Sequence, residues 1–313
     1  MLTYLQAVVI GLLQGVTELF PVSSLGHSVL VPAWLGGGWQ HLVTESAAGE
    51  TGSYLTFVVA LHVATALALL IFFRDEWVRI IKGFARTVRP SLAARRLVVG
   101  DPDERLAWLI ILATIPVGVI GLALEHPLRT LFAKPLAAAV FLTINGVILL
   151  IGERLRRLAP SDTPVVTVEQ AGLHPAPASA EKTGPVRQLA TLHYREAGVI
   201  GVFQAFALLA GISRSGISMV GGLLRGLSHP DAARFSFLLA TPVILAAGLF
   251  KLPSLAGPTA EHIHGQVLAG AVVAGAAAYA SVRWLTRYFE SRTLVPFAVY
   301  CLLAGTVSIL HFA

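Results

Sequence analysis

The chain has 313 residues, of which 55% are hydrophobic and 13% are charged, and its mean hydropathy is +0.74. Soluble domains carry about 25% charged residues, so this composition indicates an integral membrane protein. The net charge of +6 does not indicate nucleic acid as a partner, because the basic residues gather in particular loops, as membrane topology requires. The single cysteine, Cys301, excludes an intramolecular disulfide.

Apolar runs long enough to cross a bilayer as helices, roughly 17–25 residues each, recur along the chain. Two further apolar pairs, at 4–35 and 195–227, are each interrupted by a turn that contains Pro or Gly. The first run follows no basic segment and contains Gln14 and Glu18, so no cleavable signal peptide is expected. Transmembrane spans are expected at 53–73, 106–124, 132–151, 235–250, 265–285 and 294–312.

The distribution of Lys and Arg predicts which loops face the cytoplasm. The loops rich in basic residues are expected inside, and the loops with few basic residues outside. The inside loops are 74–105, 152–194 and 286–293; the outside loops are 36–52, 125–131 and 251–264. The spans then alternate only if each interrupted pair enters and leaves by one face, the first from outside and the second from inside.

We therefore expect an all-α integral membrane protein with an inverted-topology repeat, each half being one re-entrant helical hairpin plus three transmembrane helices. The first repeat covers residues 1–158 and the second 195–313. A flexible cytoplasmic loop, 159–194, of low complexity as far as 188, joins them. Both chain termini are expected on the external side.

The two interrupted pairs also resemble each other in sequence. Residues 11–27 align with 201–217 without a gap, at a constant offset of 190 residues. The identities include Gly11 with Gly201, Gln14 with Gln204, Leu19 with Leu209, Ser23 with Ser213, and Gly26 with Gly216. Paired, interrupted segments in matching halves indicate a site at the repeat interface. The alternative to a true repeat is chance similarity between two segments that are both rich in Gly and Leu.

The first turn brings together polar side chains that are costly inside a membrane. Gln14 and Glu18 are four residues apart and share one helix face. Glu18 is a candidate metal ligand or general acid–base, or a structural ion-pair partner of Arg214.

Three more polar residues follow the break at Pro21. Ser23 and Ser24 are candidates for substrate binding and nucleophilic attack, or either one caps a helix. His27 is a candidate base or nucleophile, or a buried histidine with satisfied hydrogen bonds. Whether Ser24, His27 or a water molecule acts as the nucleophile stays open.

The second turn centres on Arg214, whose planar guanidinium matches phosphate oxygens. Hydroxyl and backbone donors surround it at Ser213, Ser215, Gly216 and Ser218. Two half-helices that meet near the midplane would point free N–H groups at an anion such as phosphate. His62, inside a predicted span, is interpreted as structural.

The two turns together resemble a known family. The stretch QGVTELFPVSSLGH is similar to the EGxTEFLPVSSxGH motif of the BacA-type undecaprenyl-diphosphate phosphatases, and AGISRSGIS is similar to that family's PGxSRSGxT. The resemblance extends from about residue 4 to 312, with the 159–188 loop as an addition. It implies a hydrolase of the bacterial cell membrane that cuts polyprenyl diphosphate to the monophosphate on the external face. That reaction recycles the lipid carrier for peptidoglycan synthesis and confers bacitracin tolerance.

The resemblance also assigns roles to individual residues. Gln14 and Glu18 fall on the family's cation-binding acidic pair. The resemblance therefore implies that these two residues hold a divalent cation, Mg²⁺ or Ca²⁺. Ser24 and His27 fall on the serine and histidine placed at the scissile phosphate, and Arg214 falls on the phosphate-binding arginine. The expected partners are therefore the polyprenyl diphosphate and membrane lipids, with no nucleic acid; a homo-oligomer is left open.

The chain departs from the family motifs at several positions. Gln14 stands where glutamate is commonest, which removes one negative ligand and weakens the expected Mg²⁺ affinity. Ala210 replaces a proline, Leu25 a small residue, and Ser218 a threonine whose hydroxyl it keeps. Inverted repeats with re-entrant loops also occur in transporters, so the rival hypothesis is a lipid-phosphate transporter or flippase, or a catalytically weak relative.

Overall fold

The computed structural model describes residues 2–47, 53–132, 134–158, 187–251 and 263–313. Within these ranges the protein is helical and contains no β-strand, only an isolated bridge between Arg187 and Leu227. The helices are α1 Tyr4–Thr17, α2 Ser24–Leu35, α3 Gly37–Ala47, α4 Ser53–Phe72, α5 Arg74–Ala94, α6 Pro102–Phe132, α7 Pro135–Leu158, η2 Leu189–Thr191, α8 Tyr194–Ala205, η3 Phe206–Leu208, α9 Arg214–Leu223, α10 His229–Lys251, α11 His264–Tyr288 and α12 Val295–Phe312.

The predicted all-α membrane protein is confirmed. Among the described residues, five helices are long and apolar enough to cross a membrane: α6, α7, α10, α11 and α12. The remaining predicted span, 53–73, corresponds to α4. This helix meets the criterion of length and hydropathy only together with α5, from which it is separated by an 85° bend. Most of the predicted loop 159–194 and much of 251–264 lie outside the described residues.

The first interrupted pair forms the hairpin α1–α2. Helix α1 begins with a capping box in which Thr3 accepts from the backbone N–H of Gln6. It packs closely on α11, because Gly11 and Gly15 leave no side chain between the two backbones. The chain then turns at Pro21, and Ser23 caps α2 by accepting from the backbone N–H of Gly26 at 3.2 Å.

The second pair, α8–α9, repeats these local features 190 residues later. Gly201 lets α8 approach the backbone of α6 at Ala113, as Gly11 does for α1 and α11. Ser213 caps α9 by accepting from the N–H of Gly216 at 3.1 Å. Gly211, with φ of +113°, supplies a turn conformation that side chains rarely adopt.

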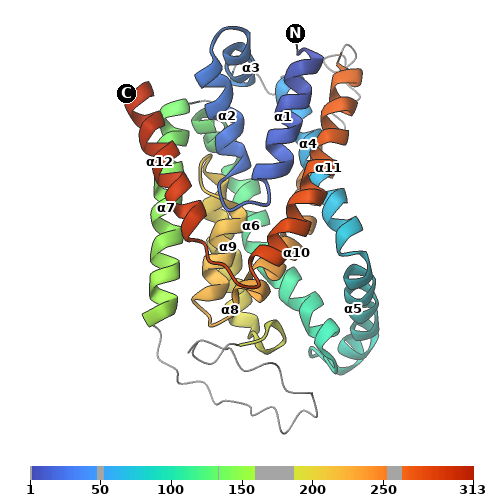
Figure 1. Ribbon diagram of the computed structural model, residues 1–313. Coiled ribbons are helices and arrows are strands. Elements are labelled where there is room, and N and C mark those ends of the chain that lie inside the picture. Colours follow the sequence, from blue (N-terminus) through green and yellow to red (C-terminus); the bar gives the residue numbers. More distant parts are fainter. Residues whose placement is uncertain (1, 48–52, 133, 159–186, 252–262) are drawn as a thin grey trace.

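The tips of the two hairpins touch inside the bundle. Ser23 Oγ accepts from the backbone N–H of Gly211 at 3.2 Å. The buried Asn145 of α7 bridges the tips: its Oδ1 accepts from Ser213 N–H at 2.9 Å, and its amide donates to the Pro21 carbonyl at 3.0 Å. Figure 1 shows α1 and α2 in the half of the molecule that carries both chain ends, and α8 and α9 in the opposite half.

Three predicted loops, 36–52, 74–105 and 125–131, contain helix instead. Neither basic charge nor glycine content by itself excludes a helix, and the third segment shows that a membrane-spanning helix can extend past its apolar run. The segment 36–52 contains α3, since in its described part, 36–47, only Gly36 and Gly37 adopt positive φ and the chain then continues as a helix. The basic segment 74–105 contains α5, whose first turn carries Asp75 and Glu76, a favourable position for acidic side chains. The link 125–131 is a continuation of α6 to Phe132.

Candidate active site

Glu18 lies at the centre of the contact between the two hairpins. Its Oε2 accepts from Ser24 Oγ at 2.5 Å and from the side-chain amide of Gln14 at 2.9 Å. Its Oε1 accepts from the guanidinium of Arg214, which belongs to the other hairpin. The predicted pair of Glu18 and Arg214 is therefore present, and a serine hydroxyl adjoins it.

This ion pair is buried. The side chains of Glu18 and Arg214 are 6% and 15% exposed. Removing either partner from such a pair leaves the other charge uncompensated, which costs about 3–5 kcal/mol. Each charge is therefore held in place by the other, and a charged ligand that enters must compete with one of them.

Arg214 is positioned by both its neighbours in sequence and a distant helix. It is the first residue of α9, directly after the Ser213 cap, and its Nη1 donates to the carbonyl of Ala240 in α10 at 3.0 Å. A guanidinium has five N–H donors, and the contacts with Glu18 and Ala240 leave others for a ligand. The start of α9 adds backbone N–H groups that favour an anion.

The predicted substrate-binding serines have three different surroundings. Ser23 and Ser213 cap helices, and for Ser23 capping was the stated alternative to substrate binding. Ser215 donates to the carbonyl of Phe20 at 3.1 Å and lies 3.0 Å from Ser213 Oγ, so it links the two turns. Ser218 Oγ is buried and has no hydrogen-bond partner among the described residues. Gly216 offers its backbone N–H to the Ser213 cap.

The ring of His27 is hydrogen-bonded to Ser23 and Tyr300. Its Nδ1 lies 2.7 Å from the carbonyl of Ser23, so Nδ1 carries the proton and donates. Its Nε2 lies 2.7 Å from Tyr300 Oη and therefore accepts from that hydroxyl when the ring is neutral. His27 is thus one helical turn from Ser24 but is tied to α12.

This arrangement can be compared with known proteins. The family model described as "Bacitracin resistance protein BacA" matches residues 7–307. The chain belongs to the BacA family. It is 60% identical to undecaprenyl-diphosphatase 2 of Frankia alni, with 100% of this chain and 98% of the relative covered. It is 56% identical to undecaprenyl-diphosphatase of Mycolicibacterium paratuberculosis, at 100% and 98% coverage, and 43% identical to undecaprenyl-diphosphatase 2 of Chromobacterium violaceum, at 98% and 98%.

The side chains around Glu18 offer oxygen atoms that could bind a divalent cation in this BacA-family protein. Among the described residues, no group of three or more His, Cys, Asp or Glu side chains could hold a metal alone. Gln14 Oε1, however, is buried without a partner in the described structure, and the same amide donates to Glu18. An amide oxygen, a carboxylate and the Ser24 hydroxyl are ligands that Mg²⁺ or Ca²⁺ accepts, with substrate oxygens and water completing the shell.

Two residues near the site escaped the sequence-based assignment. His62 of α4, interpreted as structural, lies with Nε2 3.4 Å from Glu18 Oε2, while its Nδ1 donates to the Val58 carbonyl at 2.8 Å. The sequence contained a feature that could have assigned His62 to the site, because an ionisable residue inside a transmembrane span is by default a functional candidate. Tyr300 carried no signal in the sequence, since its partner His27 is 273 residues away.

Proposed function

We propose that this BacA-family chain hydrolyses undecaprenyl diphosphate to the monophosphate and inorganic phosphate. The reaction returns the lipid carrier for peptidoglycan synthesis and confers tolerance to bacitracin. The full-length similarity to proteins named undecaprenyl-diphosphatase supports this activity. The observation that carries it at the level of residues is the buried cluster of Ser24, Glu18 and Arg214, drawn from both hairpins.

The proposed reaction begins with attack by Ser24 on the terminal phosphorus. Glu18 Oε2, which already accepts from Ser24 Oγ, takes the hydroxyl proton. The bond from the terminal phosphorus to the bridging oxygen breaks, and undecaprenyl phosphate leaves. Water then attacks the phosphorus of the phosphoserine, and Glu18 returns the proton to Ser24 Oγ as the Oγ–P bond breaks. This step gives inorganic phosphate and restores the Ser24 hydroxyl and the Glu18 carboxylate.

In such reactions negative charge on the transferring phosphoryl group must be stabilised in the transition state, and this stabilisation supplies most of the catalysis. We assign that role to Arg214 and the backbone N–H groups at the start of α9. Gln14 and Glu18 would hold the divalent cation, which neutralises phosphate oxygens when bound. Ser218, whose buried hydroxyl has no hydrogen-bond partner in the described part of the chain, is the remaining candidate donor to phosphate.

The finer architecture belongs to this proposal as well. We propose that residues 1–158 and 195–313 are inverted repeats and that the site opens to the external side of the cell membrane. Equivalent close approaches support the repeat: Gly11 of α1 lies against α11, and Gly201 of α8 lies against α6. The two caps support it further, because Ser23 and Ser213 each accept a hydrogen bond from the backbone N–H of the glycine three residues later.

The test is phosphate release from undecaprenyl diphosphate by the purified protein in detergent, with and without Mg²⁺ or Ca²⁺. We expect cation-dependent release that falls about 10²–10³-fold in Arg214→Ala, the usual loss when a charge-stabilising donor is removed. Arg195→Ala, an exposed arginine on the same hairpin, is the matched control and should keep full activity.

The rival transporter hypothesis gives a different result. Protein that is folded but releases no phosphate with any cation, and moves labelled lipid phosphate across liposomes, would replace the phosphatase proposal. A phosphoserine trapped in wild-type protein and absent in Ser24→Ala would identify the nucleophile. A trapped phosphohistidine at His27 would instead overturn the assignment to Ser24.

A further inference from the structure

The flank of the bundle between α2, α7 and α12 carries an apolar groove of about 320 Å³. Its inner end is formed by His27 and Tyr300, joined by the 2.7 Å hydrogen bond. Its outer end is formed by Trp34, whose indole N–H donates to Ser308 Oγ at 3.0 Å. The surface between the two ends is apolar, and is contributed mainly by Leu30, Val31, Leu35, Leu142, Ala304 and Val307.

The inner end lies next to the proposed reaction centre. His27 follows Ser24 by three residues in α2, so the two side chains are neighbours on the helix surface. Ser24 in turn donates to Glu18. A diphosphate bound at Glu18 and Arg214 would therefore have the first atoms of its lipid tail within reach of this groove.

The groove is also open along its length to the surrounding lipid. Trp34 is 43% exposed and Val307 is 53% exposed, so both walls reach the outside of the bundle. From His27 to Leu35 the helix rises about 12 Å, at 1.5 Å per residue. That length accommodates the head-proximal part of a polyprenyl chain, and the rest would continue into the bilayer.

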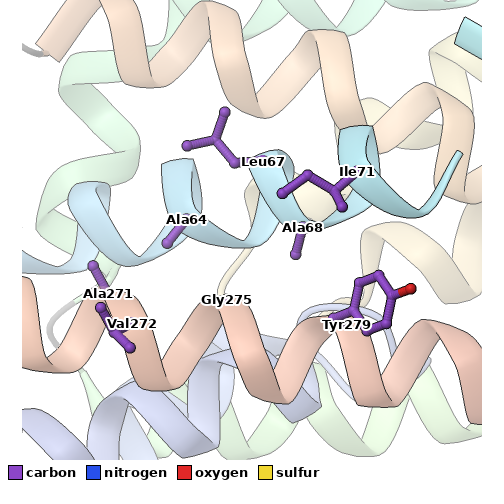
Figure 2. Close-up of a pocket in the computed structure, with 8 residues that line it drawn as sticks. All are labelled: Ala64, Leu67, Ala68, Ile71, Ala271, Val272, Gly275 and Tyr279. Carbon is purple, nitrogen blue, oxygen red and sulfur yellow. The ribbon is translucent and has the colours of Figure 1, made fainter. Parts of the chain in front are cut away.

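A second apolar groove, of about 410 Å³, lies between α4 and α11 and serves as a comparison (Figure 2). Leu67 and Ile71 of α4 and Tyr279 of α11 line it. None of the residues assigned to the site lines this groove. Apolar character alone therefore does not select a tail site, whereas contact with His27 does.

We propose that the α2/α7/α12 groove binds the first isoprene units of the substrate, and that this contact gives the enzyme its preference for long polyprenyl diphosphates. The proposal rests on the proposed function. Burial of the apolar chain stabilises the bound state in proportion to the area covered. The hydroxyl of Tyr300 and the ring of His27 mark the boundary between the diphosphate and the tail.

The test fills each groove with one matched substitution, Val307→Trp in the α2/α7/α12 groove and Val272→Trp in the α4/α11 groove. Both valines are exposed helical residues that line their groove. We expect Val307→Trp to lower kcat/KM for undecaprenyl diphosphate about tenfold, the loss typical of one or two displaced apolar groups. Isopentenyl diphosphate, which lacks a long tail, should be hydrolysed at an unchanged kcat/KM, and Val272→Trp should leave both substrates unaffected.

Unchanged kcat/KM in Val307→Trp, or a loss confined to Val272→Trp, would overturn the proposal. A second measurement does not need turnover: a polyprenyl diphosphate analogue carrying a photoreactive group in its first isoprene unit should label peptides of α2 and α12. Labelling of α4 and α11 instead would place the tail in the other groove. Labelling of α2 and α12 in protein that releases no phosphate would retain the tail site and reject the proposed hydrolysis.

Discussion

At the scale of single residues, the site depends on how a carboxylate is kept charged inside a membrane protein. Glu18 is compensated by the Arg214 guanidinium and by two hydrogen bonds, from Ser24 and Gln14. These contacts orient the Ser24 hydroxyl toward the group that would accept its proton. Structure and chemistry therefore depend on the same three contacts.

The first prediction concerns the mutual dependence of this pair. Glu18→Leu or Arg214→Met alone should destabilise the protein by about 3–5 kcal/mol, because each leaves an unpaired buried charge. The double variant should be closer to wild type in stability, although inactive, because no charge is left unpaired. The measurement is the midpoint of thermal unfolding in detergent. Losses that simply add in the double variant would mean that the two charges do not depend on each other.

The second prediction concerns Tyr300, which we assign as a positioning residue for His27. Tyr300→Phe removes the hydroxyl that donates to His27 Nε2, a hydrogen bond worth about 0.5–1.5 kcal/mol. We expect a several-fold lower kcat with little change in KM. The decisive measurement is the double variant with His27→Ala, which should be no slower than His27→Ala alone. Independent, multiplying losses would show that Tyr300 acts by another route.

At the scale of elements, glycine contacts set the position of the side chains that we propose to be catalytic. A Cβ added at Gly15 would lie 2.6 Å from the Cβ of Ala277 and 2.9 Å from the backbone nitrogen of Ala278. Helix α1 contains Gln14 and ends directly before Glu18, so a shift of α1 away from α11 would also move the carboxylate. The spacing of α1 and α11 is therefore a condition for activity.

The third prediction follows from this contact. Gly15→Val should cost about 1–3 kcal/mol, as overpacking usually does, and should lower phosphate release at the same time. Gly118→Ala in α6 is the matched control, because no atom lies within 4 Å of the added Cβ. Thermal unfolding and phosphate release would be measured on both proteins. Full activity in Gly15→Val would show that α1 tolerates displacement.

The sequence contained enough local information to predict the two hairpins and the residues of the central cluster. Pro21 and the caps Ser23 and Ser213 determine where helices end and begin, and those signals are local. A buried acid requires a buried cation, and Arg214 was the available partner. The contact of Tyr300 with His27 could not be predicted, because it depends on how α12 packs on α2. Helix α5 was missed because basic residues indicate the side of the membrane and not the backbone conformation.

At the scale of the whole molecule, the proposed inverted repeat explains why one site needs two hairpins from opposite faces. Each hairpin supplies a half-helix start, and neither alone contains both the acid and the arginine. If the halves have opposite orientation, the start of α3, which follows α2, and the turn between α11 and α12 must face opposite sides of the membrane. Positions in both segments are exposed, among them Gly38 and Ser291.

The last prediction uses this consequence. The native Cys301 is buried, so it should not react with an impermeant thiol reagent and need not be replaced. In intact cells Gly38→Cys should be labelled from outside, whereas Ser291→Cys should be labelled only after the membrane is opened. Wild-type protein, without an added cysteine, is the control for background labelling. Labelling of both positions from the same side would reject the opposed orientation of the halves. It would also reject the argument that the proposed catalytic acid and the proposed phosphate-binding arginine reach the site from opposite faces of the membrane.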